Sequence, residues 1–266
     1  MPLQAAFALP HPPIILPEVG RGEEKAIHKT TDGFRAASRM IANLQPETIV
    51  ICSPHSVLYA DYFHISEGKK YRDSMRRFGV PGLTLEAEYD EEFVGALCGI
   101  AAKEVFPAGT LGTKEDVPDH ATFIPLYFLN QQYTNYKLVR VGLSGLSLHD
   151  HFRFGKMIAQ AAADLDRKTV LVASGDLSHK LKEDGPYGYD PMGPVFDGEI
   201  ADIFSSGRLE ELEKMDPSVY EPAAECGLRS FVIMAGALYG TRIKPEMFSC
   251  EGPFGVGYAT AAFLTE

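Results

Sequence analysis

The segment TVLVASGDLSH, residues 169–179, contains the pattern from which the architecture of this chain can be predicted. Its beginning, Thr169–Ala173, is a short apolar run with β-branched side chains, which is typical of a strand buried on both faces. Gly175 and Asp176 are turn formers, so we expect the strand to end before them. A histidine, His179, follows within a few residues. The segment therefore predicts a central strand that places an imidazole beyond its carboxyl end.

The same order of strand, turn and histidine occurs twice more in the chain. FALPH ends at His11 and VICSPH ends at His55, and a proline adjoins each of these histidines. Proline restricts the backbone of its neighbour, so both imidazoles are expected on rigid segments. In open α/β sheets, ligands bind in the crevice beyond the carboxyl ends of the strands. We therefore expect His11, His55 and His179 to converge on a single site.

Apolar runs and helical patterns alternate along the whole sequence, as they do in sheets that helices cover on both faces. The predicted strands are Ala5–Leu9, Glu47–Cys52, Tyr62–Ile65, Leu138–Leu143, Thr169–Ala173 and a last strand near Gly257–Phe263. Apolar residues spaced by three and four predict helices at 22–44, Glu91–Glu104, Ala121–Leu129, Asp150–Leu165, Val195–Ser205 and Gly227–Leu238. This alternation predicts an α/β fold, a three-layer α/β/α sandwich with a mostly parallel or mixed central sheet. No linker or internal repeat divides residues 1–266, so a single domain is expected.

Two segments outside these patterns are dense in turn-forming or basic residues. They are Glu67–Pro81 and Lys180–Pro194. Glycine and proline at this density predict loops. Both loops are candidate lids over the site at the strand ends.

The composition excludes several classes of partner. Hydrophobic residues make up 45% and charged residues 23% of the 266 positions, which is typical of globular proteins. The formal net charge of −11 disfavours binding to a nucleic-acid backbone. No apolar run approaches the roughly 20 residues of a membrane helix, and the first residues lack the charged start of a signal peptide. The four cysteines form no CxxC pair, which predicts free thiols. We therefore expect a cytoplasmic protein that binds neither nucleic acid nor membrane.

Two strand-end histidines need a further ligand if they bind a divalent ion. Neutral imidazoles bind borderline metals, and an anionic oxygen would complete the set. The segment EPAAECGLRS, residues 221–230, places Glu225 just before a helical pattern, where the helix dipole favours a carboxylate. Two histidines and one carboxylate leave open positions on the ion, as in non-haem Fe(II) oxygenases. The sequence therefore predicts a metal site formed by His11, His55 and Glu225.

Five motifs follow one another along the chain: LPHPP (9–13), SPH (53–55), DHATFIPL (119–126), SGDLSH (174–179) and ECG (225–227). Together they resemble the LigB-like superfamily of class III extradiol ring-cleavage dioxygenases, and they are also similar to the related Memo-like proteins. The likeness spans nearly the whole chain and implies a LigB-like fold. It implies that His11, His55 and Glu225 bind the metal. It also implies that His179 is the catalytic acid/base and that His120 is a second catalytic histidine, near the substrate or oxygen.

The resemblance implies an enzyme that cleaves the ring of a catechol- or aminophenol-type aromatic with O2. The implied cofactor is Fe(II), with Mn(II) and Zn(II) as alternatives. An ordinary histidine pKa of about 6.5 suits His179 for proton transfer near neutral pH. Asp176 would orient His179 at the substrate, or would only cap its loop. Tyr187 and Tyr189 would line the substrate pocket, or would only pack their own loop. A small aromatic substrate and O2 are the expected partners, and a homo-oligomer is left open.

Two other functions fit the same residues. Zinc accepts two histidines and a carboxylate and activates water, which would make the chain a hydrolase. A Memo-like protein would hold a metal or a peptide in the same place without catalysis. The carboxylate of Glu225 favours the enzyme over the Memo-like alternative. Cys226 is its direct neighbour, however, and exchange of the two would change the ligand set.

Overall fold

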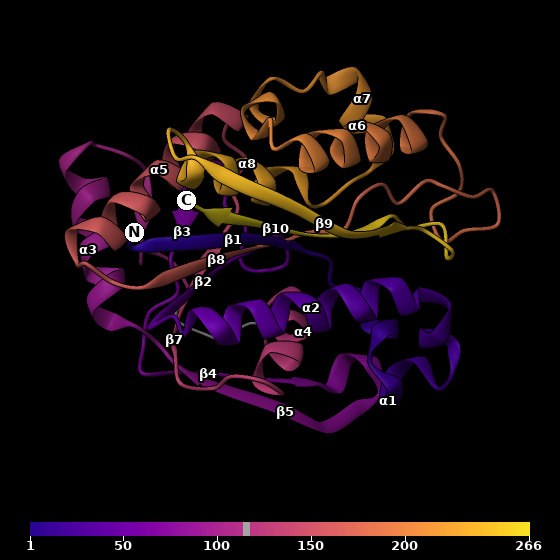
Figure 1. Cartoon of the computed structure of the whole chain (residues 1–266), viewed down its shortest axis with the longest axis horizontal. Coiled ribbons are helices and arrows are strands. Elements are labelled where there is room, and N and C mark those ends of the chain that lie inside the picture. The colour runs from indigo at the N-terminus through magenta and orange to yellow at the C-terminus, as the bar shows by residue number, and fades with distance from the viewer. Residues whose placement is uncertain (114–117) are drawn as a thin grey trace.

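The computed structural model describes residues 1–113 and 118–266, and a mixed six-stranded sheet forms its centre (Figure 1). In spatial order the strands are β7 (Lys137–Gly142), β2 (Thr48–Ser53), β8 (Thr169–Ser174), β1 (Leu3–Leu9), β10 (Tyr258–Thr265) and β9 (Ile243–Glu251). The first four are parallel to one another, whereas β10 is antiparallel to both β1 and β9. Helices cover both faces of this sheet, so the predicted three-layer α/β/α sandwich is confirmed.

The two faces of the sheet bury different helices. One face packs against α2 (His28–Leu44) and α4 (His120–Asn130). The helices on the other face are α3 (Glu91–Lys103), α5 (Leu148–Asp164), α6 (Met192–Ser206) and α8 (Leu228–Leu238). Within β2, Ile49 and Ile51 face the first set, while Val50 and Cys52 face the second. Because successive side chains of a strand point to opposite faces, a strand covered on both sides must be apolar throughout.

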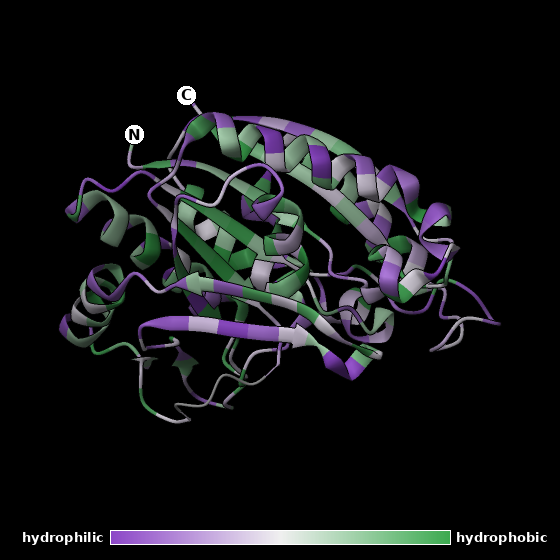
Figure 2. Cartoon of the chain, turned by 90° about the horizontal axis from the view of Figure 1, so that it is seen from below, coloured by the Kyte–Doolittle hydropathy of each residue, from purple (hydrophilic) through white to green (hydrophobic). Residues whose placement is uncertain are grey.

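Hydropathy follows this layering. Figure 2 shows hydrophobic residues concentrated on the central strands and a mixture of both kinds on the covering helices. Such mixed helices bury one apolar stripe and expose a polar one. Within the described residues, no helix combines the length and the apolar character that crossing a bilayer requires.

Helices α5 and α8 approach each other more closely than side chains normally allow. A Cβ atom on Gly155 of α5 would lie 1.9 Å from the backbone oxygen of Ile233, and a Cβ atom on Gly236 of α8 would lie 2.0 Å from that of Phe152. Only glycine fits at these two positions. The crossing fixes α8, and with it the residues just before its first turn.

The predicted central elements are present, with ends that differ from the expected ones by a few residues. The first part of the predicted helix 22–44 is a separate 3-10 turn, Glu23–Ile27, before α2 begins. The predicted strand Tyr62–Ile65 is the shorter β3 (Phe63–His64), which pairs with β6 (Ala108–Gly109) outside the main sheet. The short helices α1 (Pro17–Gly20) and α7 (Pro217–Ala223) were not predicted.

The prediction of a loop at Glu67–Pro81 is wrong. These residues contain β4 (Lys70–Met75) and the start of β5 (Val80–Glu88), which pair as an antiparallel hairpin. The hairpin is largely polar, so its alternation is weak, and only a few of its side chains, including Tyr71 and Leu85, join the core. A 3-10 turn, Arg76–Phe78, connects the two strands. The edge strand β9 was also missed.

Candidate metal centre

Four histidines gather at the carboxyl ends of the parallel strands. His11 follows β1, His55 follows β2, and His120 is the first residue of α4. The ring centroids of His11 and His55 are 4.8 Å apart, those of His11 and His120 5.3 Å, and those of His55 and His120 4.5 Å. His179, which follows β8, lies close enough that its charge lowers the pKa of His11. The structure thus brings together the four histidines that the sequence analysis named.

His11 is held by the last residue of β8 and by the segment that follows it. Its backbone amide donates to Oδ1 of Asp176 at 2.7 Å, and its Nδ1 lies 3.0 Å from Oγ of Ser174. Because Nδ1 has this partner, Nε2 is the nitrogen left to face the interior of the cluster. A hydrogen bond at one ring nitrogen is the usual way to orient a metal-binding histidine.

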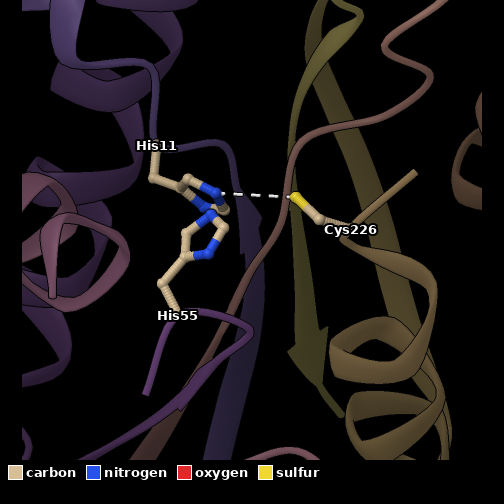
Figure 3. A group of neighbouring side chains, drawn as sticks. All are labelled: His11, His55 and Cys226. Carbon is tan, nitrogen blue, oxygen red and sulfur yellow. Dashed lines mark hydrogen bonds between the residues drawn. The ribbon is translucent and has the colours of Figure 1, made fainter. Parts of the chain in front are cut away.

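A thiol joins the histidines: Cys226, which precedes α8. Its Sγ lies 3.6 Å from Nε2 of His11 (Figure 3). One donor atom from each of His11, His55 and Cys226 lies within 4.8 Å of the donor atoms of the other two residues. A tetrahedral ion with ordinary metal–nitrogen and metal–sulfur bonds sets its donors about 3.3–3.8 Å apart. Small movements of the side chains would therefore suffice to bind an ion, and this donor set fits one.

A second group of potential ligands shares the same sulfur atom. Donor atoms of Asp176, His179 and Cys226 also lie within 4.8 Å of one another. The backbone amide of Asp176 donates to Sγ of Cys226 at 3.3 Å. The thiol is therefore the point at which the segments after β1, β2 and β8 meet the start of α8.

Glu225 does not take the place that the sequence analysis gave it. Its Oε2 accepts a hydrogen bond of 2.6 Å from the backbone amide of Leu228, the first residue of α8. Among the described residues, it belongs to neither group of clustered donors. Burial raises the pKa of its carboxyl to about 7, against the opposing effects of backbone hydrogen bonds and Arg229. The backbone turns at Ala224, which has a left-handed φ of 52°, and Cys226 rather than Glu225 then faces the histidines.

One buried carboxylate connects two of the histidine-bearing segments. Oδ1 of Asp119 accepts from the hydroxyl of Ser53 at 2.9 Å and from the amide of Ala121 at 3.0 Å. The same Ser53 hydroxyl accepts from the amide of His55 at 3.2 Å. Asp119 therefore caps α4 and ties it to the end of β2, which keeps the rings of His55 and His120 stacked.

The protonation states suit metal binding. Burial lowers the pKa of all four clustered histidines, and the pKa of His120 falls to about 4. The imidazoles are therefore neutral at pH 7, as ligands must be. Burial raises the pKa of the Cys226 thiol above its ordinary value. A bound cation reverses this preference, because a coordinated thiol loses its proton.

The loop that carries His179 is fixed from three sides. The amide of His179 donates to the carbonyl of Ala223 at 3.0 Å, and the carbonyl of Ser178 accepts from Gly257 at 2.7 Å. Oδ1 of Asp197, on α6, accepts from the amide of Ser178 at 2.8 Å. Burial raises the pKa of Asp197 to about 7. A Cβ atom at residue 257 would lie 2.0 Å from Oδ2 of Asp197, so glycine is required there.

Aromatic side chains flank the cluster. The rings of Phe78 and His120 are 5.1 Å apart, and so are those of Tyr187 and His179. Tyr187 is 60% exposed and Tyr189 50%; of these two tyrosines, only Tyr187 has a ring contact with a clustered histidine in the described part of the chain. The pKa of the buried Tyr258 is raised by burial and by the charges of Asp176 and Cys226, which places its phenol beside the site. Neither Phe78 nor Tyr258 was predicted, because neither lies in a motif.

A cavity of about 670 Å³ lies elsewhere, near the amino ends of the strands. Its lining includes Glu47, Lys137 and Arg167. Glu47 and Arg167 precede β2 and β8, and Lys137 is the first residue of β7, whereas His11, His55 and His179 follow β1, β2 and β8. The cavity therefore does not serve the cluster.

Comparison with known proteins agrees with this geometry. The family model described as the catalytic LigB subunit of aromatic ring-opening dioxygenase matches residues 5–261. Protein CA_C1420 of Clostridium acetobutylicum is 38% identical over 266 residues, which cover 97% of this chain and 57% of that protein. The chain thus spans little more than half the length of this relative. The 3,4-dihydroxyphenylacetate 2,3-dioxygenase of Escherichia coli is 20% identical over 232 residues, covering 82% of this chain and 83% of the enzyme.

A solved structure has the same fold. The uncharacterized protein JW3007 of Escherichia coli K12 superposes with a TM-score of 0.64 at 14% identity, covering 97% of this chain and 99% of that one. At this identity the likeness supports the fold alone. The family match extends over nearly all of the chain and includes every histidine of the cluster. The chain therefore belongs to the family of catalytic LigB subunits of aromatic ring-opening dioxygenases.

Proposed function

We propose that the chain is a metal-dependent dioxygenase that opens the ring of a catechol- or aminophenol-type aromatic with O2. The observation that carries the proposal is the cluster of His11, His55 and Cys226, whose donor atoms lie within 4.8 Å of one another. Family membership and the name of the Escherichia coli relative support this class of reaction. Fe(II) is the proposed ion, with Mn(II) and Zn(II) as alternatives.

The proposed ligands are His11, His55 and Cys226. Glu225, which the sequence favoured, instead accepts from the backbone of α8. Three protein ligands leave positions open on an ion, and when bound the ion would hold the two oxygens of the diol beside O2. A thiolate is softer than a carboxylate, so this set favours Zn(II), Cu(I) or Fe(II) over hard cations.

His179 is the proposed acid/base. Burial and the charge of His55 keep the pKa of its ring below the ordinary value, so the ring is neutral and can accept a proton from a substrate hydroxyl. The loop contacts to Ala223 and Asp197 hold it in place. Tyr187 covers its outer edge and would limit access of water to this proton. The ring of His120, which stacks on the His55 ring at 4.5 Å, would contact the substrate.

The test begins with anaerobic reconstitution by Fe(II), addition of catechols and aminophenols, and then admission of air. Ring fission gives a yellow product that is followed by absorbance. We expect His55→Ala to lose the metal. His179→Ala should keep the metal and lose turnover roughly 100-fold or more, the usual contribution of a general acid/base. Iron binding without turnover of any diol in the intact protein would contradict the proposal.

A second candidate function is metal binding without catalysis, as in the Memo-like alternative. Cys226 favours it, because a thiolate with two imidazoles selects soft ions such as Cu(I) and Zn(II). Competition between Fe(II), Zn(II) and Cu(I), measured by elemental analysis of the purified protein, separates the two. Preferential binding of Cu(I) or Zn(II) together with absent turnover would favour this candidate.

A further inference from the structure

The turn of the β4–β5 hairpin lies over the metal centre. The strands pair from Lys70 with Glu88 to Ser74 with Thr84, and the 3-10 turn Arg76–Phe78 connects them. The Phe78 ring meets the His120 ring edge-on, at 5.1 Å and 66°. Gly79 ends the turn with a left-handed φ of 80°, which side chains other than glycine rarely adopt. The position of the turn relative to the histidines is therefore set by a side-chain contact and by backbone geometry.

Arg77 lies inside this turn, between Arg76 and the Phe78 that contacts His120. Its side chain is exposed, and the turn that carries it contacts the cluster through the rings of Phe78 and His120. Within residues 1–113 and 118–266, Arg77 takes part in no ion pair and no hydrogen bond. Arg72 on the same hairpin differs, because its Nε lies 3.0 Å from Oε1 of Glu86. The two arginines thus share a hairpin and its solvent exposure, but only Arg72 is paired.

Two acidic groups at the cluster, Asp119 and Asp176, already accept hydrogen bonds. Asp119 accepts hydrogen bonds from Ser53 and from the first turn of α4. Asp176 accepts from the amide of His11 at 2.7 Å. Within the described residues, Arg77 is therefore a positive charge without an ion-pair partner, on a turn that contacts the histidine cluster and on a chain with a net charge of −11. An anion that reached the cluster would find its counter-charge at this turn.

We propose that Arg77 is a specificity-determining residue, which binds an anionic substituent such as a carboxylate on the aromatic ring of the substrate. This proposal rests on the proposed function in one respect, namely that the substrate ring lies against the metal centre. The diol end of the ring would face His11 and His55. Phe78 and Tyr187 would flank the ring, and the substituent would extend toward the hairpin turn. The guanidinium presents paired N–H donors that match the two oxygens of a carboxylate.

The proposal is tested by binding, which requires no turnover. Calorimetry under anaerobic conditions gives the Kd of 3,4-dihydroxybenzoate, 4-methylcatechol and 4-(2-aminoethyl)catechol for the metal-free and the metal-loaded full chain. We expect the carboxylate probe to bind roughly three- to tenfold more tightly than the neutral probe, and the cationic probe to bind most weakly. The preference should decrease at high salt, because the pair is exposed.

Variants assign the preference to one residue. Arg77→Gln should remove the carboxylate preference and leave the Kd of 4-methylcatechol unchanged, while Arg77→Lys should retain part of it. Arg72→Gln is the matched control and should behave like the unmodified protein. Equal binding of all probes by the unmodified protein, binding of none of them, or an undiminished preference in Arg77→Gln would overturn the proposal. A preference that Arg77→Gln removes, in a protein that turns over no diol, would uphold the role of Arg77 and reject the ring-opening activity.

Discussion

Glu225 and Cys226 are neighbours in sequence, yet their side chains serve different parts of the molecule. The carboxyl group of Glu225 caps the first turn of α8, whereas the thiol of Cys226 joins the histidines. Both residues carry a donor that metals accept, so the choice between them depends only on the direction of each side chain. We propose the thiol as the ligand, and this choice can be tested with two variants that each change one atom type.

We predict that Cys226→Ser weakens metal binding, while Glu225→Gln does not. Loss of a group that only orients a ligand lowers metal affinity roughly tenfold to hundredfold. Loss of a direct ligand should lower the metal affinity at least as much. Glutamine keeps an oxygen that can accept from the amide of Leu228, so α8 should stay intact in the second variant. Metal affinity is measured by competition with a chromophoric chelator. The reverse order of affinities would restore Glu225 as the ligand.

A second prediction at this scale concerns Asp197. Burial raises the pKa of its carboxyl from the ordinary 3.8 to about 7 in the folded chain. Between these values the unfolded chain releases the proton and the folded chain keeps it, so rising pH destabilises the fold. Asp197→Asn lacks this titration and can still accept from the amide of Ser178. We therefore expect the stability of the unmodified protein, relative to the variant, to fall by roughly 1 kcal/mol per pH unit between pH 4 and 7.

Urea unfolding at several pH values provides the measurement for Asp197. Other titrating groups are common to both proteins and cancel in the difference. A difference that is independent of pH over this range would show that the carboxyl group is ionised in the folded chain.

Residue by residue, the sequence predicted that the histidines gather at one edge of the sheet, but not that the Cys226 side chain lies beside them. His11, His55 and His179 follow strands, and the carboxyl ends of parallel strands must meet at one edge of a sheet. No such rule applies to Cys226, because the direction of its side chain follows from the left-handed turn at Ala224. Phe78 and Arg77 were missed for a different reason, since the hairpin that carries them was expected to be a loop.

The crossing of α5 and α8 is the element-scale feature on which the site depends. Gly155 and Gly236 let the two backbones touch, and α8 begins two residues after Cys226. A methyl group at either glycine would meet a backbone oxygen, which cannot move away alone. The helices would have to separate, and the thiol would move with α8.

We predict that Gly155→Ala destabilises the protein by about 1–3 kcal/mol through overpacking and also weakens metal binding. Alanine has the higher helix propensity, so propensity alone predicts the opposite sign. Gly198→Ala in α6 is the control, because nothing lies within 4 Å of the Cβ it would add. The control should be neutral or stabilising by up to about 1 kcal/mol. Denaturant unfolding and metal titration of both variants test this, and equal stabilities would refute the close packing.

Elements differ in how well sequence reveals them. Strands such as β2 are buried on both faces and appear as continuous apolar runs. Strand β9 lies at the edge of the sheet, carries lysine, proline and glutamate, and is only partly buried, so its pattern resembles a loop. The β4–β5 hairpin is hard to predict from sequence for the same reason, because few of its side chains are buried.

At the scale of the whole molecule, the proposed ligands belong to segments far apart in the chain. His11 follows β1 and His55 follows β2. Cys226 precedes α8, which packs on the same face of the sheet as α5. An ion bound by all three would connect these segments and would be released when the sheet unfolds. We predict that metal at 100 times its Kd stabilises the chain by roughly 2.7 kcal/mol. Denaturant unfolding with and without metal measures this, and His55→Ala should abolish the effect; equal stabilisation of that variant would place the ion elsewhere.

The pairing of β1 with β10 has a consequence for the nascent chain. The two strands lie side by side, with Ala5 opposite Leu264, although synthesis separates them by almost the full sequence. Until the ribosome releases residues 258–265, β1 has an open edge, and β9 has no neighbour in the sheet. Such unpaired edges invite association between unfinished chains. Translation must therefore reach β10 before the open edge of β1 is paired, and chaperones or rapid synthesis would limit association until then.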